Sequence, residues 1–297
     1  MRYGITFYLN YKMKYTCLHT HSLFCDGKDE IETFCETAYS KGFVSVGFSA
    51  HAPINTLSSN WHLKKERMED YFAEVKNARN KWKDKLRVFL SLEVDYIRNI
   101  SSPLDFQDYD LDYIIGAVHY VTPPNGKEPF TVDGPLEEFE KGLQECFAGD
   151  INALIESYWT EVESMIKDGG FDILAHIDLI KKNNFDEKYF SLENPPYLSH
   201  TKAIASFLSG SSIVAEINTG GLNRNKTKDT YPSLSVLRQL KEKNVPVIIT
   251  ADAHKAEHLG GNYETAKETL LKARYTKTVF FEGKQNNNSV WTEDDLT

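Results

Sequence analysis

Residues 15–27 read YTCLHTHSLFCDG, and the interpretation of the whole chain begins from this stretch. An apolar run at 15–18 leads into His19 and His21, and Asp26 follows just before a glycine. Residues i and i+2 of a strand point to the same side, so two imidazoles at a strand's end would face one point. Such a pair begins a transition-metal site, to which Asp26 could add an oxygen. Two ordinary polar residues at a strand exit explain this motif alone equally well.

The composition is that of an ordinary globular protein. The chain has 297 residues, of which 41% are hydrophobic and 26% charged, a balance typical of water-exposed folded domains. This length suits one α/β barrel as well as two smaller domains. The net charge of −9 argues against broad binding of nucleic acid or membrane surfaces. It leaves a small anionic substrate possible, because metals and a few basic side chains would dominate the field inside a pocket.

The four cysteines form no CxxC pair, so we interpret them as reduced thiols of a cytoplasmic protein. Cys17 and Cys25 flank the first motif; either could bind a metal, but we favour buried bystanders. No apolar stretch is long enough for a membrane helix. We expect Met13 to be the natural start, residues 1–12 to be an upstream extension, and residues 13–297 to form one domain.

Apolar runs alternate with helix-like segments along the chain. The expected strands after the first lie at 43–48, 87–92, 113–118, 171–175, 212–217 and 246–250, with a short final strand at 279–282. The expected helices lie at 29–41, 64–84, 136–168 (broken near Gly149), the later half of 195–210, 232–244 and 263–274. Seven β–α alternations predict a parallel sheet covered by helices.

All seven expected parallel strands end in His, Asp or Glu. In a closed barrel these ends meet at one face, whereas an open sheet would keep its outer strand ends apart, so the pattern favours a barrel. The candidate metal ligands at these ends are His19, His21, Asp26, His51, Glu93, His119, His176, Asp252 and His254. Nine donors exceed the needs of one zinc ion and suit two or three metal ions. Such clusters typically hydrolyse phosphate esters.

At this point the sequence resembles a known family, the polymerase and histidinol phosphatase (PHP) superfamily, and within it the histidinol-phosphate phosphatases. The resemblance covers roughly residues 15–259 and rests on an ordered set of motifs. They are HTHSLFCDG from His19, FSAHAP around His51, SLEVDYI around Glu93, GAVHYV around His119, LAHIDLIKK around His176, EINTGGLNR from Glu216 and ADAH from Asp252. SLEVDYI and GAVHYV favour the phosphatase branch over the polymerase-linked domains.

The resemblance implies a distorted (β/α)7 TIM-like barrel with three divalent metal ions (Zn, Mn or Fe). By its motifs, one ion would be held by His19, His21, Glu93 and Asp252, a second by Glu93, His119 and His176, and a third by Asp26, His51 and His254. Asp26 departs from the family pattern, because many relatives have a histidine nearby. A carboxylate in its place shifts the third site toward harder ions.

A phosphate ester also needs cationic partners. Arg224 is the first candidate, because a guanidinium can bind two phosphoryl oxygens. Lys182 is the second, with Lys181 as its alternative; either could equally be a solvated loop lysine. Asn218 could orient substrate or only anchor its loop, and we interpret Glu216 as facing the helices.

A substrate amine would need a carboxylate, for which Asp95 or Asp178 is available. Three further histidines are left outside the predicted site. His62 could touch the substrate or only pack, and we favour packing. We expect His200 to lie at a helix start and His258 to lie on the surface.

We therefore predict a metal-dependent phosphomonoesterase that converts L-histidinol phosphate to L-histidinol and phosphate. A second enzyme hypothesis is a PHP phosphatase or phosphodiesterase acting on a phosphotyrosyl protein, a nucleotide or a sugar phosphate. The non-enzymatic alternative is a barrel whose metals are only structural or serve binding, and it predicts no turnover with a full metal load.

Overall fold

The computed structural model describes residues 14–54, 57, 59–124, 126–286 and 288–296. The expected start at Met13 and the extension at 1–12 lie outside these ranges. At the centre is a seven-stranded sheet with the order β1-β2-β3-β4-β7-β8-β9, in which every pair is parallel. These strands are β1 (Thr16–Cys17), β2 (Ser45–His51), β3 (Arg87–Asp95), β4 (Tyr113–Ala117), β7 (Ile173–Leu174), β8 (Val214–Asn218) and β9 (Val247–Thr250).

The first and last strands of the sheet meet just beyond their carboxyl ends. Thr20 and Ala253 form a parallel bridge. The backbone N–H of His21 donates to the carbonyl of Ala253 at 2.9 Å, and that of Ala253 donates to the carbonyl of His19 at 3.1 Å. The sheet is therefore a nearly closed barrel, which confirms the expected distorted (β/α)7 architecture. The closure joins the segment that carries His19 and His21 directly to the segment that carries Asp252 and His254.

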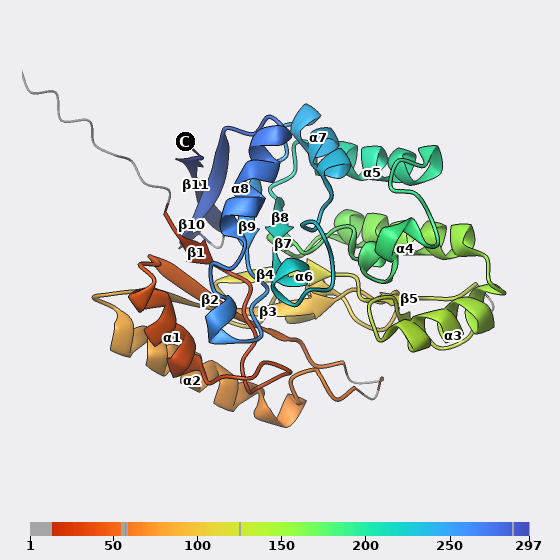
Figure 1. Ribbon diagram of the computed structural model, residues 1–297. Coiled ribbons are helices and arrows are strands. Elements are labelled where there is room, and N and C mark those ends of the chain that lie inside the picture. The colour runs from red at the N-terminus through yellow and green to blue at the C-terminus, as the bar shows by residue number, and fades with distance from the viewer. Residues whose placement is uncertain (1–13, 55–56, 58, 125, 287, 297) are drawn as a thin grey trace, which may run out of the picture.

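Helices cover the outside of the barrel (Figure 1), with α1 and α2 together on one side and α3, α4 and α5 on another. The helices are α1 (Ile31–Ser40), α2 (Met68–Trp82), α3 (Leu136–Phe147), α4 (Ile151–Asp168), α5 (Pro195–Leu208), α6 (Gly220–Asn223), α7 (Leu234–Glu242) and α8 (Tyr263–Lys272). Ala148 and Gly149, both at positive φ, separate α3 from α4 as expected. The expectation that only the later half of 195–210 is helical is wrong. The helix begins at Pro195, where a fixed φ suits the first turn.

The interior of the barrel is a separate apolar layer. Its buried residues are Leu18, Phe89, Tyr113, Ile115, Ala117, Ile173, Ala175, Val214, Ile248 and Phe281. The Tyr113 hydroxyl crosses the barrel and donates to the carbonyl of Leu18 at 2.5 Å. Gly47 on β2 makes this possible, since a Cβ there would lie 1.9 Å from the Tyr113 oxygen. Cys17 packs instead in the outer core, between strands and helices.

A C-terminal hairpin closes the amino-terminal end of the barrel. Strands β10 (Lys277–Gln285) and β11 (Asn288–Asp295) pair antiparallel, so the short strand expected at 279–282 is part of a longer element. Phe281 is fully buried and lies edge-on to Phe89 and Tyr113, with ring centroids 4.9 and 5.3 Å away. Both partners come from the beginnings of their strands. Within the described ranges, no helix is long and apolar enough to cross a membrane.

Candidate metal centre

Strand β3 places a carboxylate at the centre of the barrel. Its residues Leu90, Leu92 and Val94 pack outward into the core under the helices. The alternate residues face inward, with Phe89 in the apolar layer and Glu93 four residues further toward the carboxyl end. Glu93 is 1% exposed. The period of two along this strand therefore places a buried charge directly above the apolar layer.

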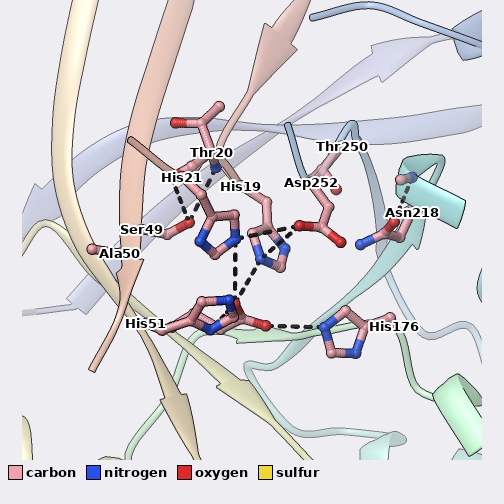
Figure 2. Close-up of polar contacts among 12 residues, drawn as sticks. His19, Thr20, His21, Ser49, Ala50, His51, His176, Asn218, Thr250 and Asp252 are labelled. Atoms are coloured by element: carbon pink, nitrogen blue, oxygen red, sulfur yellow. Dashed lines mark hydrogen bonds and ion pairs between the residues drawn. The ribbon is translucent and has the colours of Figure 1, made fainter. Parts of the chain in front are cut away.

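The first motif surrounds one oxygen of Glu93. Oε2 lies 3.1 Å from Nε2 of His19 and 3.4 Å from Nε2 of His21. Oδ1 of Asp252 lies 3.7 and 3.3 Å from the same two nitrogens. Figure 2 shows His19, His21 and Asp252 pointing toward one another, with His51 facing them. Four donor atoms from three strand ends thus converge on one point.

The other oxygen of Glu93 faces a second pair of histidines. Oε1 lies 2.9 Å from Nε2 of His176 and 3.7 Å from Nε2 of His119. The two rings are tilted, with centroids 4.8 Å apart. A carboxylate whose two oxygens face different sets of imidazoles has the arrangement of a bridging ligand between two metal ions.

A third group lies at the mouth of the barrel, around Asp26. Its Oδ2 lies 3.1 Å from Nε2 of His254, and its Oδ1 lies 3.7 Å from Nε2 of His51. Gly27 allows the tight turn that presents Asp26, because a Cβ there would lie 2.1 Å from the carbonyl oxygen of His21. Asp26 is the most exposed of the nine candidates, with 31% of its side chain accessible.

These groups have the dimensions of metal sites. Ligands about 2.1 Å from a tetrahedral ion lie roughly 3.4 Å apart, close to the separations in the group around Glu93 Oε2. The buried atoms His19 Nε2, His21 Nε2, Asp26 Oδ1 and Glu93 Oε2 have no hydrogen-bond partner, which is costly unless an ion binds them. All nine candidates fall into four donor groups, each with its atoms within 4.8 Å. The barrel thus holds a multinuclear metal-binding site.

The charges around the site perturb each other strongly. Burial alone would raise the pKa of Glu93, but the neighbouring imidazoles, His19 first, lower it well below its ordinary value. Burial lowers the pKa of His21 to about 3, helped by His254 and His51. Burial acts the same way on His119, but Asp95 overrides it and raises the pKa to about 10. The site thus mixes neutral and protonated imidazoles around anionic carboxylates before any ion binds.

Glu216 belongs to the inside of the barrel, so the interpretation that it faces the helices is wrong. It is fully buried, and its Oε1 accepts from Nδ1 of His19 at 2.6 Å and from the Thr250 hydroxyl. Its Oε2 accepts from the backbone of His176 and from the Asn218 amide, both at 2.9 Å. The signal was in the sequence, because Glu216 is two residues from Asn218 and shares its face of the strand.

Neither carboxylate considered for a substrate amine is free to bind one. Asp95 is fully buried, and its oxygens accept from His119 Nδ1 at 2.7 Å and His62 Nε2 at 2.8 Å. Asp178, also fully buried, lies 3.0 Å from the Lys181 ammonium and accepts from the backbone of Ser233 at 2.8 Å. Both carboxylates are engaged in hydrogen bonds or ion pairs inside the protein. His62 is buried, as its expected packing role requires.

Arg224 reaches the candidate ligands directly. Its Nη2 lies 3.0 Å from Oδ2 of Asp252, and its Nη1 lies 2.8 Å from Nδ1 of His254. Lys182 pairs with Asp133 at 2.8 Å. Lys181 is 3% exposed and engaged internally, so of the two lysines only Lys182 lines the pocket described next.

A pocket of about 860 Å³ opens over the site. Seven of the nine ligand candidates line it, all except His19 and His21, and so do Trp61, Asp133, Lys182, Arg224 and His258. His258, which we expected at the surface, ends the 3-10 turn Ala256–His258 and lines this open pocket, with 19% of its side chain accessible. Asp133 was not predicted. It is brought there by the pairing of β5 (Tyr120–Val121) with β6 (Phe130–Thr131).

Two further expectations concern residues beside the site. His200 lies inside α5, where Nε2 is 2.9 Å from Oε2 of Glu156, and not at the helix start. Among the described residues, the donor groups include no cysteine. Cys25 lies 3.5 Å from Nδ1 of His21, and burial, followed by Asp26, raises its pKa to about 12. Its place outside every donor group is consistent with a bystander.

Proteins of known sequence resemble this chain over most of its length. A probable histidinol-phosphatase of Deinococcus radiodurans is 25% identical over 256 residues, which cover 85% of this chain and 91% of that protein. The histidinol-phosphatase of Bacillus subtilis is 25% identical over 271 residues, covering 84% of this chain and 97% of that one.

A solved structure has the same fold. It is histidinol phosphate phosphatase from Lactococcus lactis subsp. lactis, complexed with zinc, L-histidinol and phosphate. It superposes with a TM-score of 0.71 at 18% sequence identity, covering 92% of this chain and 100% of that chain. The model of the PHP domain family matches residues 18–220, more than half of this chain. Together with the buried His, Asp and Glu groups, this match shows that the chain belongs to the PHP domain family and is a metal-dependent hydrolase.

Proposed function

We propose that this protein is a phosphomonoesterase that hydrolyses L-histidinol phosphate to L-histidinol and phosphate. The observation that carries the proposal is the position of Glu93, whose two oxygens face two sets of histidines at the floor of an open pocket. The substrate is suggested by the curated relatives, which are histidinol-phosphatases, and by the zinc, L-histidinol and phosphate in the Lactococcus structure.

In this proposal three divalent ions, zinc, manganese or iron, occupy the site. The first would be held by His19, His21, Glu93 and Asp252, the second by Glu93, His119 and His176, and the third by Asp26, His51 and His254. When bound, these ions supply Lewis acidity toward phosphoryl oxygens and lower the pKa of a water nucleophile. The protein holds the ligands in place and supplies the groups that recognise the ester.

Arg224 is the proposed phosphate-binding residue. In its present position the guanidinium contacts Asp252 and His254, so it lies beside the proposed first and third ions. A planar guanidinium can donate two hydrogen bonds to one phosphoryl group and offset its negative charge. Lys182 is the second proposed cation, and its pairing with Asp133 places it in the same pocket.

The acidic part of the pocket wall favours a cationic leaving group. Asp133 and Glu138 both line the pocket. The ion pair with Lys182 and the nearby His119 help to lower the pKa of Asp133, although burial opposes them. An ionised carboxylate there suits the ammonium group of histidinol, the role for which Asp95 and Asp178 are unavailable.

A different observation favours the second candidate, a more highly charged ester such as a nucleotide. Lys28, Lys226 and Lys255 also line the pocket. Three ammonium groups exceed what one phosphate already bound by Arg224 and metal ions requires. A second anionic group on the substrate could use them.

Phosphate release decides between these candidates. Zinc- or manganese-loaded protein is assayed with L-histidinol phosphate, an aryl phosphate and a nucleoside monophosphate, beside His119→Ala and the matched surface variant His200→Ala. We expect fast release from L-histidinol phosphate, lost in His119→Ala and retained in His200→Ala. Release from the nucleotide or the aryl ester alone would refute the substrate and keep the hydrolase. No release from any ester by fully metal-loaded protein would favour the non-enzymatic alternative.

A further inference from the structure

A chain of buried hydrogen bonds leads away from the metal centre to the pocket wall. Nδ1 of His119 lies 2.7 Å from Oδ1 of Asp95, and Oδ2 of the same carboxylate lies 2.8 Å from Nε2 of His62. Nδ1 of His62 lies 2.6 Å from the hydroxyl of Ser59. His62 and Asp95 are both nearly inaccessible, with side chains 4% and 0% exposed. Neither can touch a substrate.

The chemistry of the carboxylate fixes the proton positions in this chain. An ionised carboxylate only accepts hydrogen bonds, and each oxygen of Asp95 faces one imidazole nitrogen, of His119 or of His62, within 2.8 Å. His119 therefore donates from Nδ1 to Asp95, and Nε2, which faces Glu93, is the nitrogen that a metal ion would take once its proton has left. His62 carries its proton on Nε2. In the neutral ring this leaves Nδ1 as the acceptor, and the Ser59 hydroxyl lies 2.6 Å from it as the donor.

Asp95 depends on both donors to keep its orientation. With His62 absent, Oδ2 would be a buried anionic oxygen without a partner, a state that costs free energy unless the side chain moves. Movement of the carboxylate would release Nδ1 of His119. The ring of His119 could then turn, or carry its proton on the other nitrogen, and Nε2 would no longer be held toward Glu93.

We propose that His62 is a positioning residue of the metal centre, which acts through Asp95 to fix the tautomer and the orientation of His119. The inference rests on the proposed role of His119 as a metal ligand. It goes beyond that role because it assigns a function to His62, which is linked to His119 through Asp95 by two buried hydrogen bonds. Outer carboxylate partners of metal-bound histidines commonly contribute 10–100-fold to metal affinity, and His62 extends this support by one residue.

His62 also packs against Trp61, with ring centroids 3.7 Å apart, so a test must separate hydrogen bonding from packing. His62→Phe keeps an aromatic ring and removes both nitrogens. His62→Gln removes the ring and keeps an N–H donor near the position of Nε2. His62→Met removes both features and serves as a second variant without a donor. His200→Phe is the matched control, because this histidine lies in α5 on a surface ion pair.

The measurement is zinc bound per chain during competition with a chelator, with circular dichroism and thermal melting as tests of folding. We expect His62→Phe and His62→Met to lose about 10–100-fold in affinity for one zinc ion. His62→Gln and His200→Phe should match the parent protein.

Three results would overturn the inference. The first is full zinc affinity in His62→Phe or in His62→Met. The second is an equal loss in His62→Gln, which would assign the effect to the ring and its packing on Trp61. The third is a loss of zinc affinity in every variant that follows the fall in its melting temperature. Because no phosphate ester is used, failure to hydrolyse L-histidinol phosphate would not affect this test.

Discussion

Replacing Glu216 by glutamine tests how the barrel orients His19, a proposed metal ligand. The carboxylate receives four donors, two on each oxygen. Oε1 faces His19 Nδ1 and the Thr250 hydroxyl, and Oε2 faces the backbone of His176 and the Asn218 amide. A glutamine has one oxygen and one amino group, so in either orientation its amino group faces two of these donors.

The two orientations differ in cost. If the amino group faces the backbone of His176, that N–H has no alternative partner. Turning the Asn218 amide would break its bond to the N–H of Gly220 at 2.7 Å. Each unsatisfied buried donor costs about 1–3 kcal/mol. If the amino group faces His19, the Thr250 hydroxyl can rotate, and His19 can move its proton from Nδ1 to Nε2. The second orientation is therefore favoured, and it protonates the nitrogen that faces Glu93.

We expect Glu216→Gln to fold and to bind zinc weakly. Loss of a charged hydrogen-bond acceptor should reduce the unfolding free energy of the metal-free protein by roughly 1–3 kcal/mol. Zinc affinity should fall about 10–100-fold, and phosphatase activity should fall with it. Urea denaturation in chelator gives the first quantity, and zinc competition gives the second. The matched control is Glu156→Gln, whose carboxylate is 68% exposed. Unchanged zinc affinity in a folded Glu216→Gln protein would refute this reasoning.

Three further predictions follow from the site. Arg224→Ala should lower kcat/KM for the preferred ester about 10–100-fold, the equivalent of a lost charged hydrogen bond; steady-state kinetics equal to the parent would contradict its role. Chelation should lower the melting temperature, because ions that bind only the folded state stabilise it by about 2.7 kcal/mol per site at a concentration of 100 Kd; an unchanged melting curve would contradict a bound metal centre. Zinc binding should release protons into weak buffer and tighten as pH rises, since the raised pKa of His119, about 10, keeps its second proton on at neutral pH. In the metal-free protein the raised pKa of His119 adds to the free energy of unfolding. This contribution is full below about pH 6.5 and is lost as pH rises through 10.

The grouping of the nine candidates could be predicted because it depends on one rule. Parallel strands that close into a barrel bring their carboxyl ends together, so a run of His, Asp and Glu at those ends marks one site. The error at Glu216 came from the same rule, applied with the wrong parity. Asn218 lies two residues further along β8, and the two side chains are hydrogen-bonded to each other.

Other features depend on contacts that no local pattern encodes. Asp133 enters the pocket because Val132 donates its backbone N–H to the carbonyl of His119 at 2.9 Å, and the surrounding loop has no periodicity to indicate this. The C-terminal hairpin was underestimated for a similar reason. Its second strand is largely polar, with one buried residue, and the register of the pair shifts between Phe281 and Gly283, which breaks the alternation expected of a strand.

The apolar and charged layers of the barrel depend on each other. Phe89 and Glu93 lie on the same face of β3, four residues or about 13 Å apart. Ionised Glu93 is stable in the interior only if imidazoles or metal ions surround it, because an isolated buried charge is very costly. Those imidazoles are held in register by strands that the layer around Tyr113 and Phe281 packs together. The hairpin that supplies Phe281 therefore supports the metal centre from the opposite end of the barrel, although it contributes no residue to any of the donor groups in the described chain.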